Sequence, residues 1–148
     1  MEPPLMRWIK LGLRLVVGGL FVVAGMLKAV EPAPFLAAIE NYHILPHTLA
    51  VAAAFYLPYL EILCGGCLLL GRWQMGALVL MVGMTLVFIL ALASAWARGL
   101  NIACGCFGEG GEPGRYGLAL LRDLLLLAAL CWLWRQDAKR HEENDLPA

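Results

Sequence analysis

The sequence predicts an all-α fold, a four-helix transmembrane bundle with a short extracytoplasmic amphipathic helix. Of the 148 residues, 61% are hydrophobic and only 15% are charged, whereas soluble domains average roughly 45–50% and about 25%. A transmembrane helix needs about 20 mostly apolar residues. Four segments meet this length, at about 11–30, 49–70, 75–97 and 116–134. We therefore expect a single integral membrane domain over 1–148, with the charged residues 136–148 forming a frayed cytoplasmic tail.

The flanks of each apolar segment support its assignment. The first follows a basic start, but it is longer than a signal-peptide core and no cleavage site follows it, so we expect a retained span. The second contains Pro58, which removes one backbone hydrogen bond and should bend the helix just before Glu61. The third is uninterrupted, and a glycine-rich connection at 98–115 separates it from the fourth.

Basic residues set the orientation in the membrane. They flank the first span, lie in the turn at 71–74 and follow the last span: Arg7, Lys10, Arg14, Arg72, Arg135, Lys139 and Arg140. All lie on one side, so the positive-inside rule puts both termini and this turn in the cytoplasm. The connections at 31–48 and 98–115 then face outward. Because 11 basic residues balance 11 acidic ones, nothing favours a nucleic-acid partner, and the lipid bilayer is the expected surroundings.

The first outer connection carries the amphipathic helix, which we predict between Pro34 and Pro46. Apolar residues recur on one face at helical spacing: Phe35, Ala38, Ile39, Tyr42 and Leu45. Pro34 suits the first turn of a helix, and Pro46 should end it. We expect this helix to lie on the outer surface of the membrane.

Cys104 and Cys106 are separated by a single glycine in the last connection. A two-residue step spans at most about 7 Å and a disulfide needs Cα atoms about 4.4–6.8 Å apart, so a bridge closes only if Gly105 lets the backbone turn. Such a tight ring is strained, and strained bridges are the labile, exchanging ones. The pair is a candidate for disulfide exchange outside the cytoplasm, where disulfides persist. A structural clip or two free thiols are the alternatives.

Cys64 and Cys67 lie three residues apart in the second span, so both thiols share one helix face. This is the Cys-x-x-Cys spacing of thiol oxidoreductases, although the pair lacks the helix N-terminus that activates the first thiol in those proteins. Gly65 and Gly66 equally favour a close helix-packing surface here. At 1.5 Å per residue, Cys67 lies on the order of 9 Å to the cytoplasmic side of Glu61, far from the outer connection.

Ionisable residues inside a span are costly and are therefore functional candidates. Glu61 stands near the centre of the second span, and Arg122 lies about six residues into the fourth. Antiparallel helices bring them to similar depth, which predicts a Glu61–Arg122 pair with either a proton-handling or a purely structural role. Lys28, near the end of the first span, is expected to reach outward to Glu31.

No resident metal is expected. His43 and His47 have a spacing that metal ligands use, but Pro46 intervenes and no third ligand is evident. Thiolates do bind Cu(I) and Hg(II) well, so transport of a soft metal by the paired cysteines is one alternative function.

Six segments of the chain form a recognisable pattern. They are Phe21–Lys28, Pro32 with Phe35, Tyr42–Pro46, Leu57–Glu61 with Gly71, Cys104–Gly108 and Leu121–Leu124. Their order and spacing resemble the MauE branch of the DoxX-like membrane proteins over nearly the whole chain. The positions that match the family pattern are Lys28, Glu61, Cys104, Cys106 and Arg122. Cys64 and Cys67 look like an addition to it.

The resemblance implies a four-span protein of the bacterial inner membrane, associated with methylamine utilisation. It implies help in forming the disulfides of the methylamine dehydrogenase small subunit, beside a periplasmic thioredoxin-like partner. We therefore expect a membrane thiol-disulfide oxidoreductase, in which Cys104 or Cys106 forms a mixed disulfide with that partner. Electrons would pass either through Cys64 and Cys67 or to a quinone in the bundle. A non-enzymatic assembly factor is the other alternative.

Overall fold

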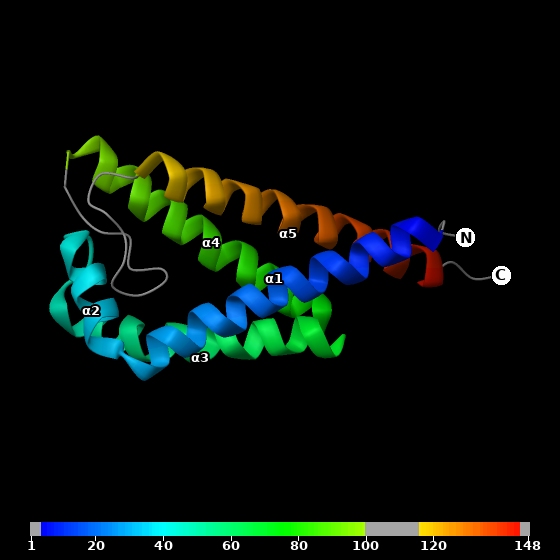
Figure 1. Cartoon of the computed structure of the whole chain (residues 1–148), viewed down its shortest axis with the longest axis horizontal. Coiled ribbons are helices and arrows are strands. Elements are labelled where there is room, and N and C mark those ends of the chain that lie inside the picture. The colour runs from blue at the N-terminus through cyan, green and yellow to red at the C-terminus, as the bar shows by residue number, and fades with distance from the viewer. Residues whose placement is uncertain (1–3, 100–115, 146–148) are drawn as a thin grey trace.

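The computed structural model describes residues 4–99 and 116–145, and helices joined by short turns make up these ranges. In chain order the helices are α1 (Pro4–Val30), α2 (Pro32–Asn41), α3 (His47–Leu70), α4 (Gln74–Ala97) and α5 (Tyr116–Asp145). Their arrangement, shown in Figure 1, confirms the predicted all-α bundle.

Among the described helices, all except α2 are long and apolar enough to cross a bilayer. The candidate spans are Leu5–Val30, His47–Leu70, Gln74–Ala97 and Gly117–Ala138. They agree closely with the predicted segments, and the protein is a multi-pass membrane protein. Beyond its span α5 continues as a helix to Asp145, where the sequence predicts a frayed tail. This extension is rich in Lys, Arg and Glu, which are good helix formers.

The four long helices form two pairs (Figure 1). α1 packs mainly against α3, and α4 packs mainly against α5. The pairs approach each other near the chain termini, which lie at the same end of the molecule, and they diverge toward α2. A tight turn connects the pairs, because Gly71 adopts the left-handed conformation (φ 71°) that ends α3.

Glycines let α1 and α3 approach closely. A Cβ atom at Gly25 would lie 2.7 Å from the carbonyl oxygen of Pro58, and one at Gly65 would lie 2.7 Å from the carbonyl oxygen of Gly18. Both distances are far shorter than a van der Waals contact, so these positions need a residue without a side chain. The packing role is thus confirmed for Gly65. Gly66 takes no part in the packing of α3 against α1, because no described atom of the chain would lie within 4 Å of a Cβ there.

The apolar core joins the two helix pairs. Its buried members are Val17, Phe21, Cys64, Leu68, Ala77, Leu78, Met81, Met84, Leu130 and Leu133. At the end of the bundle that holds the termini, Arg14 of α1 donates hydrogen bonds of 2.6 and 2.7 Å to the carboxylate of Asp137 on α5. This contact ties the first helix to the last.

α2 begins slightly earlier and ends earlier than predicted. Three residues of the predicted apolar face are buried: Phe35, Ala38 and Tyr42. Leu45 is 42% exposed, because the helix ends before it and the chain leaves that face. Arg98, just past α4, donates a hydrogen bond to the backbone carbonyl of Tyr42, which fixes α2 to the end of α4.

Candidate functional site

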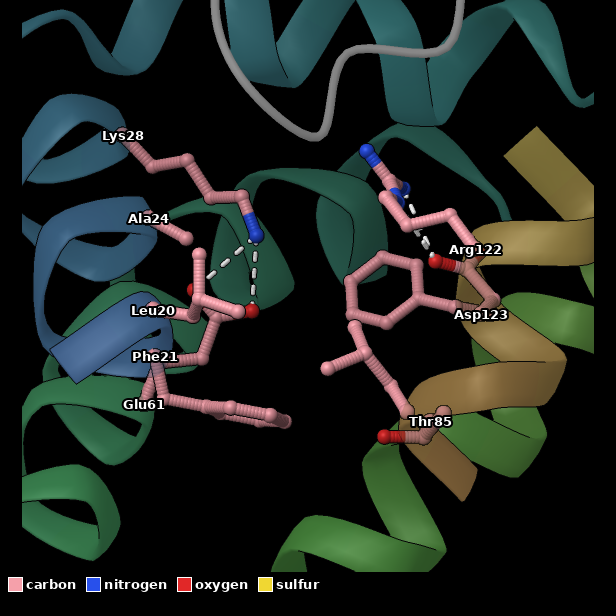
Figure 2. Close-up of a pocket in the computed structure, with 10 residues that line it drawn as sticks. Leu20, Phe21, Ala24, Lys28, Glu61, Thr85, Arg122 and Asp123 are labelled. Atoms are coloured by element: carbon pink, nitrogen blue, oxygen red, sulfur yellow. Dashed lines mark hydrogen bonds and ion pairs between the residues drawn. The ribbon is translucent and has the colours of Figure 1, made fainter. Parts of the chain in front are cut away.

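A pocket of about 60 Å³ lies between the two helix pairs, within the membrane-spanning part of the bundle. All four long helices line it: Leu20, Phe21, Ala24, Lys28, Glu61, Thr85, Phe88, Arg122, Asp123 and Leu126. Figure 2 shows Lys28 and Glu61 on one side of the pocket, and Arg122 and Asp123 on the other. Apart from Thr85, the other lining residues are apolar, so opposite charges converge at a pocket with mostly apolar walls.

Lys28 and Glu61 form a buried ion pair on one side of the pocket. The Lys28 Nζ donates to both carboxylate oxygens of Glu61, at 2.7 and 2.9 Å, and each side chain is only 4% exposed. The pair forms because Gly25 brings α1 into contact with α3 beside Glu61. Lys28 lies three residues after Gly25 and so shares that face of the helix.

Two aromatic rings complete the surroundings of the Lys28 ammonium. Its Nζ lies 4.9 Å from the ring centroid of Phe35 on α2 and 5.1 Å from that of Phe88 on α4. The electron-rich face of an aromatic ring attracts a cation, most strongly where water is excluded. α2 and α4 therefore both help to hold the charge of Lys28 within the bundle.

Arg122 and Asp123 lie on the opposite side of the pocket, on α5 (Figure 2). The Arg122 Nε and Nη2 donate to Oδ1 of Asp123 at 2.9 and 2.8 Å. The Asp123 side chain is 8% exposed and that of Arg122 is 35% exposed. Thr85, also in the wall, donates its hydroxyl to the carbonyl oxygen of Met81 at 2.8 Å.

The structure corrects two predicted contacts. Glu61 and Arg122 line the same pocket, as their expected depths require, but Glu61 pairs with Lys28 and Arg122 pairs with Asp123. Lys28 is buried and points into the bundle, so its predicted contact with Glu31 is wrong. The reason is packing, because α1 lies directly against α3 whereas α5 lies against α4. Asp123 is the pocket residue that the sequence interpretation missed, and its signal is an ionisable group inside a span.

Cys64 and Cys67 lie on α3, beyond Glu61 in the direction of Gly71. Cys64 is 2% exposed and belongs to the apolar core, and Cys67 packs partly buried beside it. Both are free thiols. Burial of this kind suits a small hydrophobic side chain, and a redox role for the pair stays a prediction.

Cys104 and Cys106 lie outside the described residues, so their exchange chemistry stays a prediction. The connection that contains them joins the end of α4 to the start of α5. Arg122 follows the first residue of α5 by six positions. Both helices that bound this connection therefore also line the charged pocket.

An apolar groove of about 350 Å³ between α1 and α5 adjoins the pocket and shares Arg122 and Leu126 with it. Its other lining residues are all apolar: Leu13, Val16, Val17, Leu118, Leu121, Leu125 and Ala129. Such a lining suits a hydrocarbon chain. In the part of the chain that the structure describes, no three His, Cys, Asp or Glu side chains gather closely enough to hold a metal ion.

Fold and site together define a multi-pass helical membrane protein with paired charges buried between its spans. The family model of the methylamine utilisation protein MauE matches residues 6–136, most of the chain. The chain therefore belongs to the MauE family, as its sequence motifs predict.

Two proteins named MauE are similar in sequence to this chain. The chain is 32% identical over 126 residues to the methylamine utilization protein MauE of Paracoccus denitrificans, an alignment that covers 84% of this chain and 66% of that protein. It is 29% identical over 117 residues to the protein of the same name from Methylophilus methylotrophus, covering 78% and 62%. The aligned part thus spans slightly less than two thirds of each relative. No solved structure matches the chain.

Proposed function

We propose that this chain is an inner-membrane thiol-disulfide redox protein that exchanges disulfides with a periplasmic thioredoxin-like partner. The observation that carries the proposal is the Cys104-Gly-Cys106 segment, in the connection between two spans of a MauE family member. The names of its relatives support a place in methylamine utilisation. The exchange would serve the maturation of an exported protein that contains disulfides.

The exchange is a two-electron transfer between thiols. With Cys104 and Cys106 reduced, one thiolate attacks a disulfide sulfur of the partner, and a mixed disulfide forms as one partner thiolate leaves. The second cysteine then attacks the first, which closes the Cys104–Cys106 ring and releases the partner as a dithiol. This chain loses two electrons and two protons, and the partner gains them. The reverse sequence oxidises the partner.

The charged pocket supports the proposal through its position, because it lies beside both helices that bound the connection. The connection leaves α4 and enters α5, and both helices face the pocket that holds the Lys28–Glu61 pair and the Arg122–Asp123 pair. Separating desolvated charges costs much free energy. The Lys28–Glu61 pair therefore holds α1 against α3 beside the pocket, whereas the Arg122–Asp123 pair lies within α5 at the end that follows the connection.

We infer that both termini are cytoplasmic and that the Cys104 connection faces the periplasm. Both termini lie at one end of the bundle (Figure 1), where basic residues are frequent. A variant that keeps Cys104 as its single cysteine should react with a membrane-impermeant maleimide in intact spheroplasts. Reaction only after the spheroplasts are lysed would reverse the proposed orientation.

Trapping the mixed disulfide between this chain and its partner tests the exchange itself. Cys106→Ser leaves Cys104 without its resolving thiol, so a mixed disulfide with the partner should accumulate and should disappear on reduction. Cys131 is a free thiol in the fourth span. Cys131→Ser is therefore the matched control, and it should accumulate no mixed disulfide with the partner. Full growth on methylamine with both Cys104 and Cys106 replaced by serine would favour an assembly factor instead. Accumulation of Cu(I) in vesicles, dependent on the cysteines, would favour transport.

A quinone is the electron acceptor that the groove favours. The groove between α1 and α5 suits an isoprenoid tail, and Arg122 lies where the groove meets the pocket. In the reverse sequence, in which this chain oxidises the partner, the Cys104–Cys106 dithiol that remains would give two electrons and two protons to the quinone, which restores the disulfide and releases the quinol. A relay through Cys64 and Cys67 is the alternative. Reoxidation in quinone-free liposomes that is lost in the C64A/C67A variant would favour the relay.

A further inference from the structure

The outward face of α3 carries two tyrosines that its neighbours in the bundle do not cover. Tyr56 is 78% exposed and Tyr59 is 63% exposed. Within the described part of the chain, neither hydroxyl forms a hydrogen bond. α3 runs along the edge of the bundle opposite α5 (Figure 1), so this face points away from the other spans.

Both tyrosines lie near mid-depth in the membrane. Tyr56 follows His47 by nine residues and Tyr59 precedes Leu70 by eleven, which puts them about 14 and 16 Å from the two ends of the span. The exposed Trp73 and Trp96 bracket the neighbouring helix α4 at its two ends, as interfacial tryptophans do. A tyrosine side chain cannot reach either interface from the middle of the span. Its hydroxyl therefore sits in hydrocarbon, where an unpaired polar group is costly.

The same face leaves room for another helix. Leu63 and Gly66 continue the stripe of Tyr56 and Tyr59 at helical spacing. Leu63 is 63% exposed, and no described atom would lie within 4 Å of a Cβ at Gly66. A glycine facing outward lets a second helix backbone approach closely in the membrane.

We propose that this face of α3 binds a second copy of the chain about a two-fold axis along the membrane normal. Copies inserted in the same orientation place identical residues at the same depth on either side of such an axis. A hydroxyl both donates and accepts hydrogen bonds, so Tyr56 pairs with its own copy, and so does Tyr59. A different partner would need its own polar side chains at these two depths. The dimer is independent of the disulfide chemistry proposed above.

Energy transfer between donor- and acceptor-labelled full-length chains tests the proposal in liposomes over a range of protein-to-lipid ratios. The wild type should dimerise. Y56F/Y59F keeps both rings and removes only the hydroxyls, and it should weaken the dimer by on the order of tenfold, since interhelical hydrogen bonds in membranes contribute about threefold each.

Gly66→Leu should abolish the dimer by blocking the close approach. Gly83→Leu is the matched control, because Gly83 is an exposed glycine of α4 with the same open surroundings, and it should leave the dimer intact. A monomer at every ratio overturns the proposal. A dimer whose stability is unchanged in Y56F/Y59F also overturns the proposal. Equal weakening of the dimer by Gly66→Leu and Gly83→Leu overturns it as well.

Discussion

Replacing Lys28 by methionine leaves the Glu61 carboxylate buried without its cation. The two hydrogen bonds of 2.7 and 2.9 Å are lost, and the side chain of Glu61 is only 4% exposed, so little water is available to replace them. Removing one partner of a buried ion pair costs about 3–5 kcal/mol. We therefore expect Lys28→Met to lower the free energy of unfolding by about that amount.

Glu61→Gln should cost less, although it breaks the same pair. The Lys28 ammonium keeps the rings of Phe35 and Phe88 at 4.9 and 5.1 Å, and a desolvated cation gains about 1–2 kcal/mol from such contacts. The difference between the two variants should be of that order. The K28M/E61Q double variant buries no charge, so it should be more stable than Lys28→Met alone.

Reversible unfolding in mixed detergent micelles, followed by tryptophan fluorescence, measures these four free energies as a double-mutant cycle. We expect strong coupling between the two substitutions, with a higher free energy of unfolding for the double variant than for Lys28→Met. Additive losses would refute the reasoning, because they would mean that the two charges do not depend on each other in the folded protein. A Glu61→Gln variant less stable than Lys28→Met would refute the role assigned to the rings.

The same assay checks substitutions at four further residues. Gly25→Ala should lose about 1–3 kcal/mol, because its Cβ would lie 2.7 Å from a backbone oxygen of α3. Gly19→Ala, with no described atom within 4 Å, should lose almost nothing, and equal losses would contradict the close-packing argument. Asp137→Ala should cost about 1–3 kcal/mol, since it leaves Arg14 without the carboxylate it binds; an unchanged midpoint would show that the contact does not tie α1 to α5. Cys64→Ala should cost about 1 kcal/mol as a small core deletion and should retain mixed-disulfide formation, whereas loss of exchange in a stable variant would give this thiol a redox role.

The charged pocket was only partly predictable. Glu61 and Arg122 stand out in the sequence because each is ionisable within an apolar run, and depth counting puts them at the same level. Depth does not determine which charges meet, since four spans offer several neighbours at each level. Lys28 near the end of its helix can reach outward or inward, and the sequence alone favoured the outward contact with Glu31.

The sequence by itself determined the number and limits of the spans, because the length of an apolar run against the bilayer thickness is a local property. It also determined most of the buried face of α2, through the 3.6-residue period. Only the tertiary structure decided the partner of Glu61. That choice depends on how closely α1 approaches α3, and the approach requires a glycine at position 25 to meet the backbone of Pro58 on another helix. Contacts of this kind join residues far apart in the chain, so no local pattern records them.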